Sequence, residues 1–446
     1  MTHIAIVGGS DAGVMAGMWA HRASPDITTT LVVADHYPNF SICGIPFYVS
    51  GETPHYEMLA HRTADDLRNL GLDLLLGHTA TAIDVEEHVL TIANGDGTTH
   101  QLDYDQLIIG TGARPRRPNV PGFDLPGVHV LHTIDEARTL RTLIDDGAHK
   151  VAIVGAGYIG TELADAAAHR GLDVSLIEMA PAVMPTFDPA LGALIGAELA
   201  AHGVDVHTDT MVEQIEQSGD RLRVTAGDVE ITADAVVLAL GVMPNVELAT
   251  AVGAATGAGG ALAVDTTMAT GLIDVWAAGD CVHTHHVLYD EPTYLPLGTT
   301  AHKQGRVAGI NAAGGTATYR GSLGTQAVKI IGKVAARTGL RLDEATAAGF
   351  DAFEVGGTFD DHKAYYPGAT DLVVSLCADR TSGRLLGAQL VGAYGAEVSK
   401  RVDIAAAAIH AGSSVTDLLD LDLSYTPPLS SPWDPVQTAA MAAWQP

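Results

Sequence analysis

The chain has 446 residues, of which 47% are hydrophobic and 17% charged, a balance that suits two or three globular domains. The formal net charge of −29 disfavours nucleic acid and anionic membranes as partners. No apolar run reaches the roughly 18–20 residues that a membrane-spanning helix needs, and no signal peptide precedes the first apolar segment, so we expect a cytoplasmic protein.

A glycine-rich loop from Gly8 to Gly13 follows the first expected strand. Gly8 permits a tight turn, and Gly13 permits close packing of the next helix, expected over residues 14–23, against that strand. The helix N-terminus would then present backbone N–H groups to a pyrophosphate. Ser10 departs from the usual pattern, which has a glycine there, but Asp35 ends the next strand, where an acid accepts hydrogen bonds from ribose hydroxyls. The loop therefore predicts a dinucleotide site.

Cys43 lies a short distance beyond this loop, in the segment 39–46. We interpret it as a reactive thiolate rather than an inert buried cysteine, because a helix beginning near Gly44 would stabilise the anion. A lone thiolate can form a mixed disulfide with a small thiol or cycle through sulfenic acid. Cys281 and Cys377 lie far from Cys43 in the sequence, and we expect them to be structural.

Two apolar strands end in small or acidic residues. The first leads to Thr111 and Gly112, and the second leads to Gly279 and Asp280. Each pattern alone indicates only a strand followed by a turn. Beside a dinucleotide loop, they indicate the rest of a flavin site, in which Asp280 holds the ribityl hydroxyls of FAD.

A second glycine-rich loop is complete, with Gly155, Gly157, Tyr158, Ile159 and Gly160 between an apolar strand and an expected helix over residues 161–170. Glu178 ends the following strand, and no arginine comes immediately after it. An acid at this place favours the free 2′-hydroxyl of NADH and repels a 2′-phosphate, although use of NADPH is left open. Two nucleotide sites and one thiol predict a flavoprotein that moves electrons from a nicotinamide through FAD to sulfur.

With these motifs in this order, the chain resembles the FAD-dependent pyridine nucleotide-disulfide oxidoreductases. Within them it is similar to the single-cysteine branch of coenzyme A-disulfide reductases, NADH oxidases and NADH peroxidases. The resemblance covers essentially the whole chain, including Gln304-Gly305-Arg306 and the C-terminal stretch 425–432. It implies an α/β protein with two Rossmann-like domains and an α+β dimerisation domain, and hence a homodimer. The FAD domain would comprise residues 1–112 and 246–322, the NAD(P)H domain residues 113–245, and the dimerisation domain residues 323–446.

The resemblance also implies two catalytic tyrosines near Cys43, contributed by the partner subunit. Their counterparts are Tyr365 and Tyr425, with Tyr366 as the alternative to Tyr365. A tyrosine there would donate a proton or a hydrogen bond to a departing thiolate. The peroxide-handling histidine of the oxidases and peroxidases is replaced by Asp11, which favours a disulfide reductase.

We therefore predict an NADH-dependent reductase of a low-molecular-weight disulfide or persulfide. Coenzyme A stays open as the carrier, because Asn39 and Ile42 stand where the coenzyme A enzymes have a serine and an asparagine. The alternatives are an NADH oxidase working through a Cys43 sulfenic acid and a non-catalytic flavoprotein that senses NADH. The histidines at 283, 285 and 286 are interpreted as solvated side chains, so no metal site is expected.

Overall fold

The computed structural model of the chain describes residues 2–443, which form two compact units. Unit 1 contains the chain up to Arg116, His132–Arg138 and Gly241–Ser322. Unit 2 contains Arg117–Leu131, Thr139–Leu240 and the chain from Leu323 onward. Within residues 2–443, no helix is both long and apolar enough to cross a membrane.

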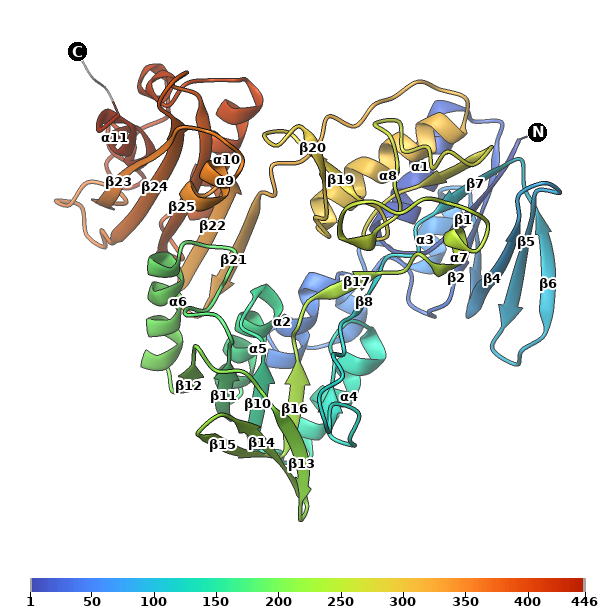
Figure 1. Cartoon of the computed structure of the whole chain (residues 1–446), viewed down its shortest axis with the longest axis horizontal. Coiled ribbons are helices and arrows are strands. Elements are labelled where there is room, and N and C mark those ends of the chain that lie inside the picture. The colour runs from blue at the N-terminus through green and yellow to red at the C-terminus, as the bar shows by residue number, and fades with distance from the viewer. Residues whose placement is uncertain (1, 444–446) are drawn as a thin grey trace. The chain divides into compact units, whose positions relative to one another are not determined.

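Unit 1 is built on a parallel five-stranded sheet in the order β18-β7-β1-β2-β3. Its strands β7, β1 and β2 are labelled in Figure 1. Its central strand, β1, is apolar from Ile4 to Val7 and buried throughout, as expected of a parallel strand covered on both faces. Helices α1 and α8 cover one face, and the antiparallel sheet of β4, β5 and β6 packs against the other. The elements of these three layers are β1 (His3–Val7), α1 (Asp11–Ala23), β2 (Thr28–Val33), β3 (Leu72–Leu76), β4 (His78–Asp84), β5 (Val89–Asn94), β6 (Thr99–Asp103), β7 (Gln106–Ile109), β18 (Val275–Ala277) and α8 (Gly298–Ala312).

Further elements complete unit 1, and one of them, α4, continues into unit 2. They are the 3-10 helices η1 (Ile42–Gly44), η2 (Tyr56–Leu59) and η3 (Ala258–Gly260), the helices α2 (Ile45–Ser50), α3 (Ala64–Asn69), α4 (Ile134–Asp145) and α7 (Glu247–Thr250), and the strands β8 (Ala113–Pro115), β17 (Val242–Pro244), β19 (Thr284–His286) and β20 (Glu291–Thr293).

Unit 2 contains a second parallel sheet and an antiparallel sheet near the C-terminus. The parallel sheet has the order β12-β11-β10-β16-β9 and is accompanied by the small sheet β13-β14-β15. All of these strands except β9 are labelled in Figure 1. These elements are β9 (Val128–His129), β10 (Lys150–Val154), α5 (Tyr158–His169), β11 (Asp173–Ile177), α6 (Pro189–Ala201), β12 (Val204–His207), β13 (Gln214–Ser218), β14 (Arg221–Ala226), β15 (Val229–Ala233) and β16 (Ala235–Leu238).

The C-terminal sheet has the order β21-β22-β25-β24-β23, with β25 buried along nearly its whole length. Its elements are β21 (Gln326–Ile330), β22 (Lys333–Gly339), α9 (Leu342–Ala347), β23 (Ala352–Asp360), β24 (Asp371–Asp379), β25 (Leu385–Ala393), α10 (Val398–His410), η4 (Thr416–Asp420) and α11 (Pro435–Met441). Polar contacts join this sheet to the parallel one, since Lys329 pairs with Asp165 at 3.2 Å and Gln389 accepts the backbone N–H of Asp188 at 2.8 Å.

The two helices that follow the glycine-rich loops begin earlier than the sequence pattern indicated. Helix α1 starts at Asp11 rather than at residue 14, and α5 starts at Tyr158 rather than at residue 161. In both cases a loop residue, Ser10 or Gly157, occupies the N-cap position in extended geometry. The loop therefore turns directly into the helix, and its last glycine lies inside the first helical turn.

Candidate active site

The first glycine-rich loop is held by close backbone approaches. Gly8 has φ +118°, and a Cβ there would lie 2.0 Å from the carbonyl oxygen of Gly110. A Cβ on Gly13 would lie 2.0 Å from the carbonyl oxygen of Gly8. Ser10 caps α1 without a side-chain hydrogen bond, so the first N–H groups of this 13-residue helix are directed at whatever occupies the loop.

Helix α8 supports this loop from the other side. A Cβ on Gly305 would lie 2.3 Å from the carbonyl oxygen of Ala12, so only glycine allows α8 to pack this closely on α1. The neighbouring Gln304 is fully buried, and its Oε1 accepts the backbone N–H of Gly279 at 3.0 Å. The Gln304-Gly305 pair thus fixes the strand end that carries Asp280 against the loop.

Two carboxyl groups lie together at this point. Burial, with a smaller contribution from the nearby Asp11, raises the pKa of Asp280 to about 6. Burial also raises the pKa of Asp11, while His302 and His61 lower it. The Nδ1 atom of His302, on α8, lies 3.6 Å from Oδ2 of Asp11. An imidazole therefore does reach the loop, but from a distant part of the chain that sequence reasoning did not connect with it.

These residues fit a polar dinucleotide. Oδ1 of Asp11 and Nδ2 of Asn39 are buried and have no hydrogen-bond partner within residues 2–443. Open space adjoins Gly112, where an added Cβ would meet no atom within 4 Å. Asp35 uses Oδ1 to accept the backbone N–H of Tyr37 at 2.9 Å, which orients its carboxylate. Buried, unpartnered polar atoms beside a helix N-terminus and open space are what FAD would require here.

The structure brings the Cys43 segment to this loop. The backbone N–H of Asn39 donates to the carbonyl oxygen of Gly9 at 2.7 Å, and Arg62 donates to the Asn39 side chain at 3.3 Å. Cys43 lies in η1 and is exposed. Helix α2 begins at Ile45, close to the expected place, but it has only six residues, so its dipole is short.

The other two cysteines are buried, and no disulfide joins any of the three. Burial raises the pKa of the Cys281 thiol, and it raises the pKa of the Cys377 thiol to about 12. Neither thiol is therefore suited to nucleophilic chemistry near neutral pH.

The second loop repeats the geometry of the first. Gly155 has φ +99°, and a Cβ on Gly160 would lie 1.9 Å from the carbonyl oxygen of Gly155. A Cβ on Gly157 would meet no atom within 4 Å, so the loop is open on that side. Glu178 accepts the N–H of Ala156 at 2.7 Å through Oε2 and that of Ala180 at 2.9 Å through Oε1. Glu178 therefore shapes the loop as well as presenting a carboxylate.

Helix α5 carries further titratable groups. Burial raises the pKa of Tyr158, at its start, to about 12, and Ile159 follows it at a partly buried position. Glu162, one turn later, was not singled out from the sequence. Burial, with a smaller contribution from Asp165 and an opposing effect of Lys329, raises its pKa to about 7. Only the fold reveals this perturbation, because Lys329 comes from β21 in the C-terminal sheet.

Tyr365 and Tyr425 meet in unit 2. Loss of hydration raises the pKa of Tyr365, and the neighbouring Tyr425 hydroxyl raises it to a smaller extent. The backbone N–H of Lys363 donates to the carbonyl oxygen of Pro427 at 3.2 Å, which joins the two segments. Tyr366 instead packs its ring edge-on against His362, with centroids 5.8 Å apart. Tyr365 is therefore the one of the two adjacent tyrosines that pairs with Tyr425.

The interpretation of the histidines after Asp280 as solvated side chains is wrong for two of them, because His283 and His286 are buried. His283 bonds through Nε2 to the carbonyl oxygen of Val264 at 2.8 Å, and Nδ1 of His286 accepts the backbone N–H of Leu288 at 3.3 Å. Among the residues that the structure describes, no group of three His, Cys, Asp or Glu side chains is placed to hold a metal ion.

Comparison with known families decides the class of protein. The profile of the pyridine nucleotide-disulphide oxidoreductases matches residues 2–305, and the profile of their dimerisation domain matches residues 325–435. The chain belongs to this family. The family and the α/β fold class expected from the sequence are confirmed, and this oxidoreductase is an enzyme by its membership.

Individual relatives cover nearly the whole oxidoreductase. The NAD(P)H sulfur oxidoreductase (CoA-dependent) of Pyrococcus furiosus is 33% identical over 437 residues, 97% of each chain. An NADH oxidase of Methanocaldococcus jannaschii is 31% identical over 438 residues, 98% of this chain and 97% of the relative.

Solved structures agree with this family. A NAD-dependent persulfide reductase from A. fulgidus is 36% identical, with a TM-score of 0.96 over 99% of this chain and 83% of the other. An FAD-dependent pyridine nucleotide-disulphide oxidoreductase from Desulfovibrio vulgaris is 28% identical, with a TM-score of 0.79 over 99% of both chains.

Proposed function

We propose that this oxidoreductase uses NADH and FAD to reduce a low-molecular-weight disulfide or persulfide through Cys43. The observation that carries the proposal is the exposed Cys43 thiol on a segment hydrogen bonded to the first glycine-rich loop. Relatives whose names specify sulfur or persulfide reduction support the same chemistry. We place the enzyme in the cytoplasm, as the sequence suggested.

Different residues bind FAD, bind NADH and carry out the thiol chemistry. FAD is held by the first glycine-rich loop and the strand ends around it, namely Gly8, Ser10, Gly13, Asp35, Thr111, Gly112, Gly279 and Asp280. NADH is held by the second loop and the acid after it, namely Gly155, Gly157, Tyr158, Ile159, Gly160 and Glu178. When bound, the flavin supplies a two-electron relay between the nicotinamide and sulfur. The Cys43 thiolate attacks the acceptor disulfide RSSR, forms the Cys43–S–S–R bond and releases RS⁻, which takes up a proton. Two electrons then cleave the mixed disulfide, which releases the second RS⁻, to be protonated in turn, and returns Cys43 to the thiolate.

The single-cysteine chemistry needs the tyrosine pair as well. We propose that Tyr365 and Tyr425 of one subunit serve Cys43 of the other in a homodimer, where they hydrogen bond the departing thiolate. The match of residues 325–435 to the family's dimerisation domain supports this arrangement. Coenzyme A stays one candidate carrier, because a relative is named as dependent on it. Asn39 stands where the coenzyme A enzymes have a serine, and its side chain here accepts a hydrogen bond from Arg62.

The first test is anaerobic consumption of NADH by the FAD-loaded protein with a panel of disulfides and persulfides. We expect rapid turnover with at least one acceptor and loss of about 10²-fold or more in Cys43→Ser, because the nucleophile is gone. Cys377→Ala is the matched control and should keep wild-type turnover, since that thiol is buried. Full turnover in Cys43→Ser would refute the proposed role.

An NADH oxidase is the second candidate. It is favoured by His302, whose imidazole lies 3.6 Å from Asp11 at the loop, and by the relative named NADH oxidase. Consumption of NADH only after oxygen is admitted, with no anaerobic disulfide reduction, would select this function over the first.

A further inference from the structure

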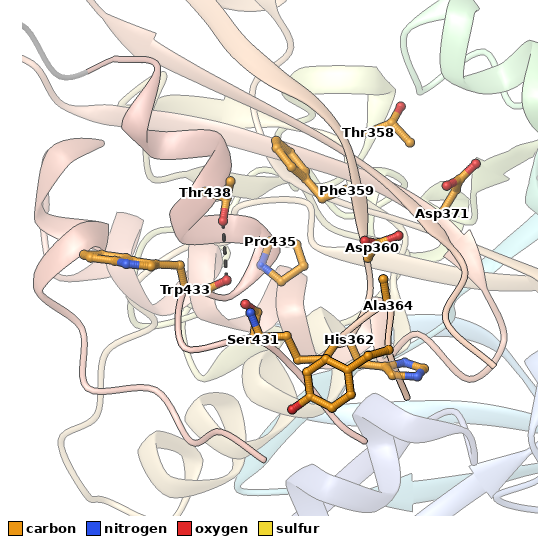
Figure 2. A pocket seen from close by; sticks show the side chains of 12 residues that line it. Thr358, Phe359, Asp360, His362, Ala364, Asp371, Ser431, Trp433, Pro435 and Thr438 are labelled. Carbon is orange, nitrogen blue, oxygen red and sulfur yellow. Dashed lines mark hydrogen bonds between the residues drawn. The ribbon is translucent and has the colours of Figure 1, made fainter. Parts of the chain in front are cut away.

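The C-terminal sheet of unit 2 has different neighbours at its two edges. Strand β23 forms one edge, where a pocket of about 550 Å³ adjoins the end of this strand, the start of β24 and the segment 431–438 (Figure 2). Tyr365 lines this pocket, so that edge belongs to the tyrosine pair. Near the opposite edge, β22 and the start of α9 reach the segment 184–187, which follows Glu178 in the chain. The β22 side of the sheet can therefore act on the second glycine-rich loop.

Three consecutive backbone carbonyl groups of this segment accept hydrogen bonds from two arginines. Arg341, at the N-cap of α9, donates through Nη1 to the carbonyl oxygens of Pro185 at 2.9 Å and Phe187 at 2.7 Å. Arg337, in β22, donates through Nη1 to the carbonyl oxygen of Thr186 between them. Hydrogen bonds from a charged donor are stronger than neutral ones. The two guanidinium groups therefore fix the path of the chain from Pro185 to Phe187.

Two carboxylates hold the arginines in this position. Glu344 accepts Nη1 of the buried Arg337 at 3.2 Å and its Nη2 at 2.6 Å. The same carboxylate accepts the backbone N–H of Arg341 at 2.9 Å, and Nη2 of Arg341 pairs with Asp343 at 2.8 Å. The guanidinium groups are thus oriented by the protein itself, and their charges are balanced.

The segment held by the arginines contacts the second glycine-rich loop. The backbone N–H of Met184 donates to the carbonyl oxygen of Ala156 at 2.7 Å. The hydroxyl of Thr186 donates to the hydroxyl of Tyr158 at 3.4 Å, and the rings of Phe187 and Tyr158 have centroids 6.3 Å apart. Tyr158 is the first residue of α5. A displacement of the segment would therefore also displace the start of this helix.

We propose that Arg337 and Arg341 are positioning residues for NADH, because they fix the segment 184–187 and thereby hold Tyr158 at the N-terminus of α5. The inference rests on the proposed binding of NADH at the second glycine-rich loop. It adds residues of the C-terminal sheet to a site whose other members come from the parallel sheet and its loops.

The physical reason is preorganisation. If the segment were free to move, NADH would bind only the fraction of molecules in which the loop is correctly arranged, and its affinity would fall by that fraction. The arginine donors are used on the segment and on the two carboxylates. We therefore expect a larger effect on the affinity for NADH than on the rate of hydride transfer.

The test measures NADH binding apart from the sulfur chemistry. Anaerobic stopped-flow reduction of the FAD-loaded enzyme, without any disulfide, gives the Kd for NADH and the limiting rate of flavin reduction. Arg341→Gln should raise Kd about tenfold, because glutamine is too short to hold both carbonyl groups, and should change the limiting rate less than about threefold. Arg380→Gln is the matched control. Its arginine follows β24 with a side chain 59% exposed, and both values should stay at wild type.

A double-mutant cycle tests the route through Tyr158. Thr186→Val removes the hydroxyl that donates to Tyr158 and conserves the shape of the side chain, so it should raise Kd about threefold. In Thr186→Val/Arg341→Gln, the rise in Kd should be well below the product of the two single effects, because both substitutions release the same segment. An arginine that only stabilises the fold would lower the temperature of unfolding in Arg341→Gln and leave Kd unchanged.

The outcomes separate this inference from the proposed function. A wild-type flavin that NADH does not reduce would overturn both. An unchanged Kd in folded Arg341→Gln would overturn the positioning role alone, and so would single effects that multiply in the double variant. Flavin reduction by NADH without turnover of any disulfide would overturn the sulfur chemistry, while the measured Kd values would still decide this inference. If Arg341→Gln does not fold, Thr186→Val decides, and an unchanged Kd there contradicts the proposal.

Discussion

At the scale of single residues, the burial of ionisable carboxyl groups destabilises the protein at the place where we expect FAD to bind. Asp11 and Asp280 are two acids in one partly buried place, and burial together with the nearby Asp11 raises the cost of ionising the Asp280 carboxyl. Such a pair destabilises the empty protein. It is suited to a partner that brings hydroxyl groups, because hydrogen bonds to a carboxylate restore the solvation that burial removed.

Asp280→Asn should make the apoprotein more stable and the holoprotein weaker. The pKa of Asp280 rises from 3.8 to about 6 on folding, so the folded state binds a proton more tightly, and stability falls as pH rises through this window. The gain from the substitution should grow from about 1 kcal/mol at pH 4.5 to about 3 kcal/mol at pH 7.5. Urea unfolding of the apoprotein measures it, and flavin fluorescence should show weaker FAD binding. An equal gain at both pH values would contradict the argument.

The preference for NADH should depend on Glu178 and on the residue after it. The Glu178 carboxylate would repel a 2′-phosphate, and the side chain of Met179 is 71% exposed, so nothing opposes its replacement by a longer cation. In Met179→Arg with Glu178→Gln, where the amide Oε1 can still accept one loop N–H, the ratio of kcat/KM for NADPH to that for NADH should rise at least tenfold. Met211→Arg, at another exposed methionine of unit 2, should leave the ratio unchanged.

Site features that depend on local sequence could be predicted from the sequence, and features that depend on tertiary packing could not. Both glycine-rich loops could be found because a tight turn and a close helix approach leave no alternative to glycine. Three other features could not be found from the sequence, because burial or contacts made by the fold create them. They are the imidazole of His302 beside Asp11, the raised pKa of Glu162 and the buried Asp361–His362 pair. The pairing of Tyr365 with Tyr425 was expected only from the family resemblance.

At the scale of elements, the contact between α1 and α8 should control the flavin loop. Gly305→Ala would place a Cβ 2.3 Å from the carbonyl oxygen of Ala12. The helices would have to separate, at a cost of about 1–3 kcal/mol, and FAD affinity should fall because Ala12 lies in the loop.

Gly196→Ala in α6 is the matched control for this prediction. Its Cβ would make only an ordinary contact at 3.7 Å with Val183, so the substitution should be neutral or stabilising by about 0.5–1 kcal/mol. Thermal unfolding and flavin fluorescence measure both variants. Equal behaviour of the two would show that the helix contact does not set the loop geometry.

At the scale of the whole molecule, the proposed site is complete only when two subunits contribute to it. Tyr365, Tyr425, Leu429 and Trp433 are large, exposed side chains of the C-terminal part of the chain. Exposed apolar groups that gather in one region mark an interface more often than a free surface. We therefore expect a homodimer in which the cysteine and the tyrosine pair of one site come from different copies.

Complementation between inactive variants tests this arrangement. Cys43→Ser and the double variant Tyr365→Phe/Tyr425→Phe should each lose most disulfide reduction. Co-refolded in equal amounts, they should recover about a quarter of wild-type activity, because half of the dimers are mixed and each mixed dimer keeps one intact site. A cysteine and tyrosines that act within one chain would give no recovery, since every site would then lack one of them. Mixing Cys43→Ser with the triple variant Cys43→Ser/Tyr365→Phe/Tyr425→Phe controls for the refolding itself and should stay inactive under either arrangement.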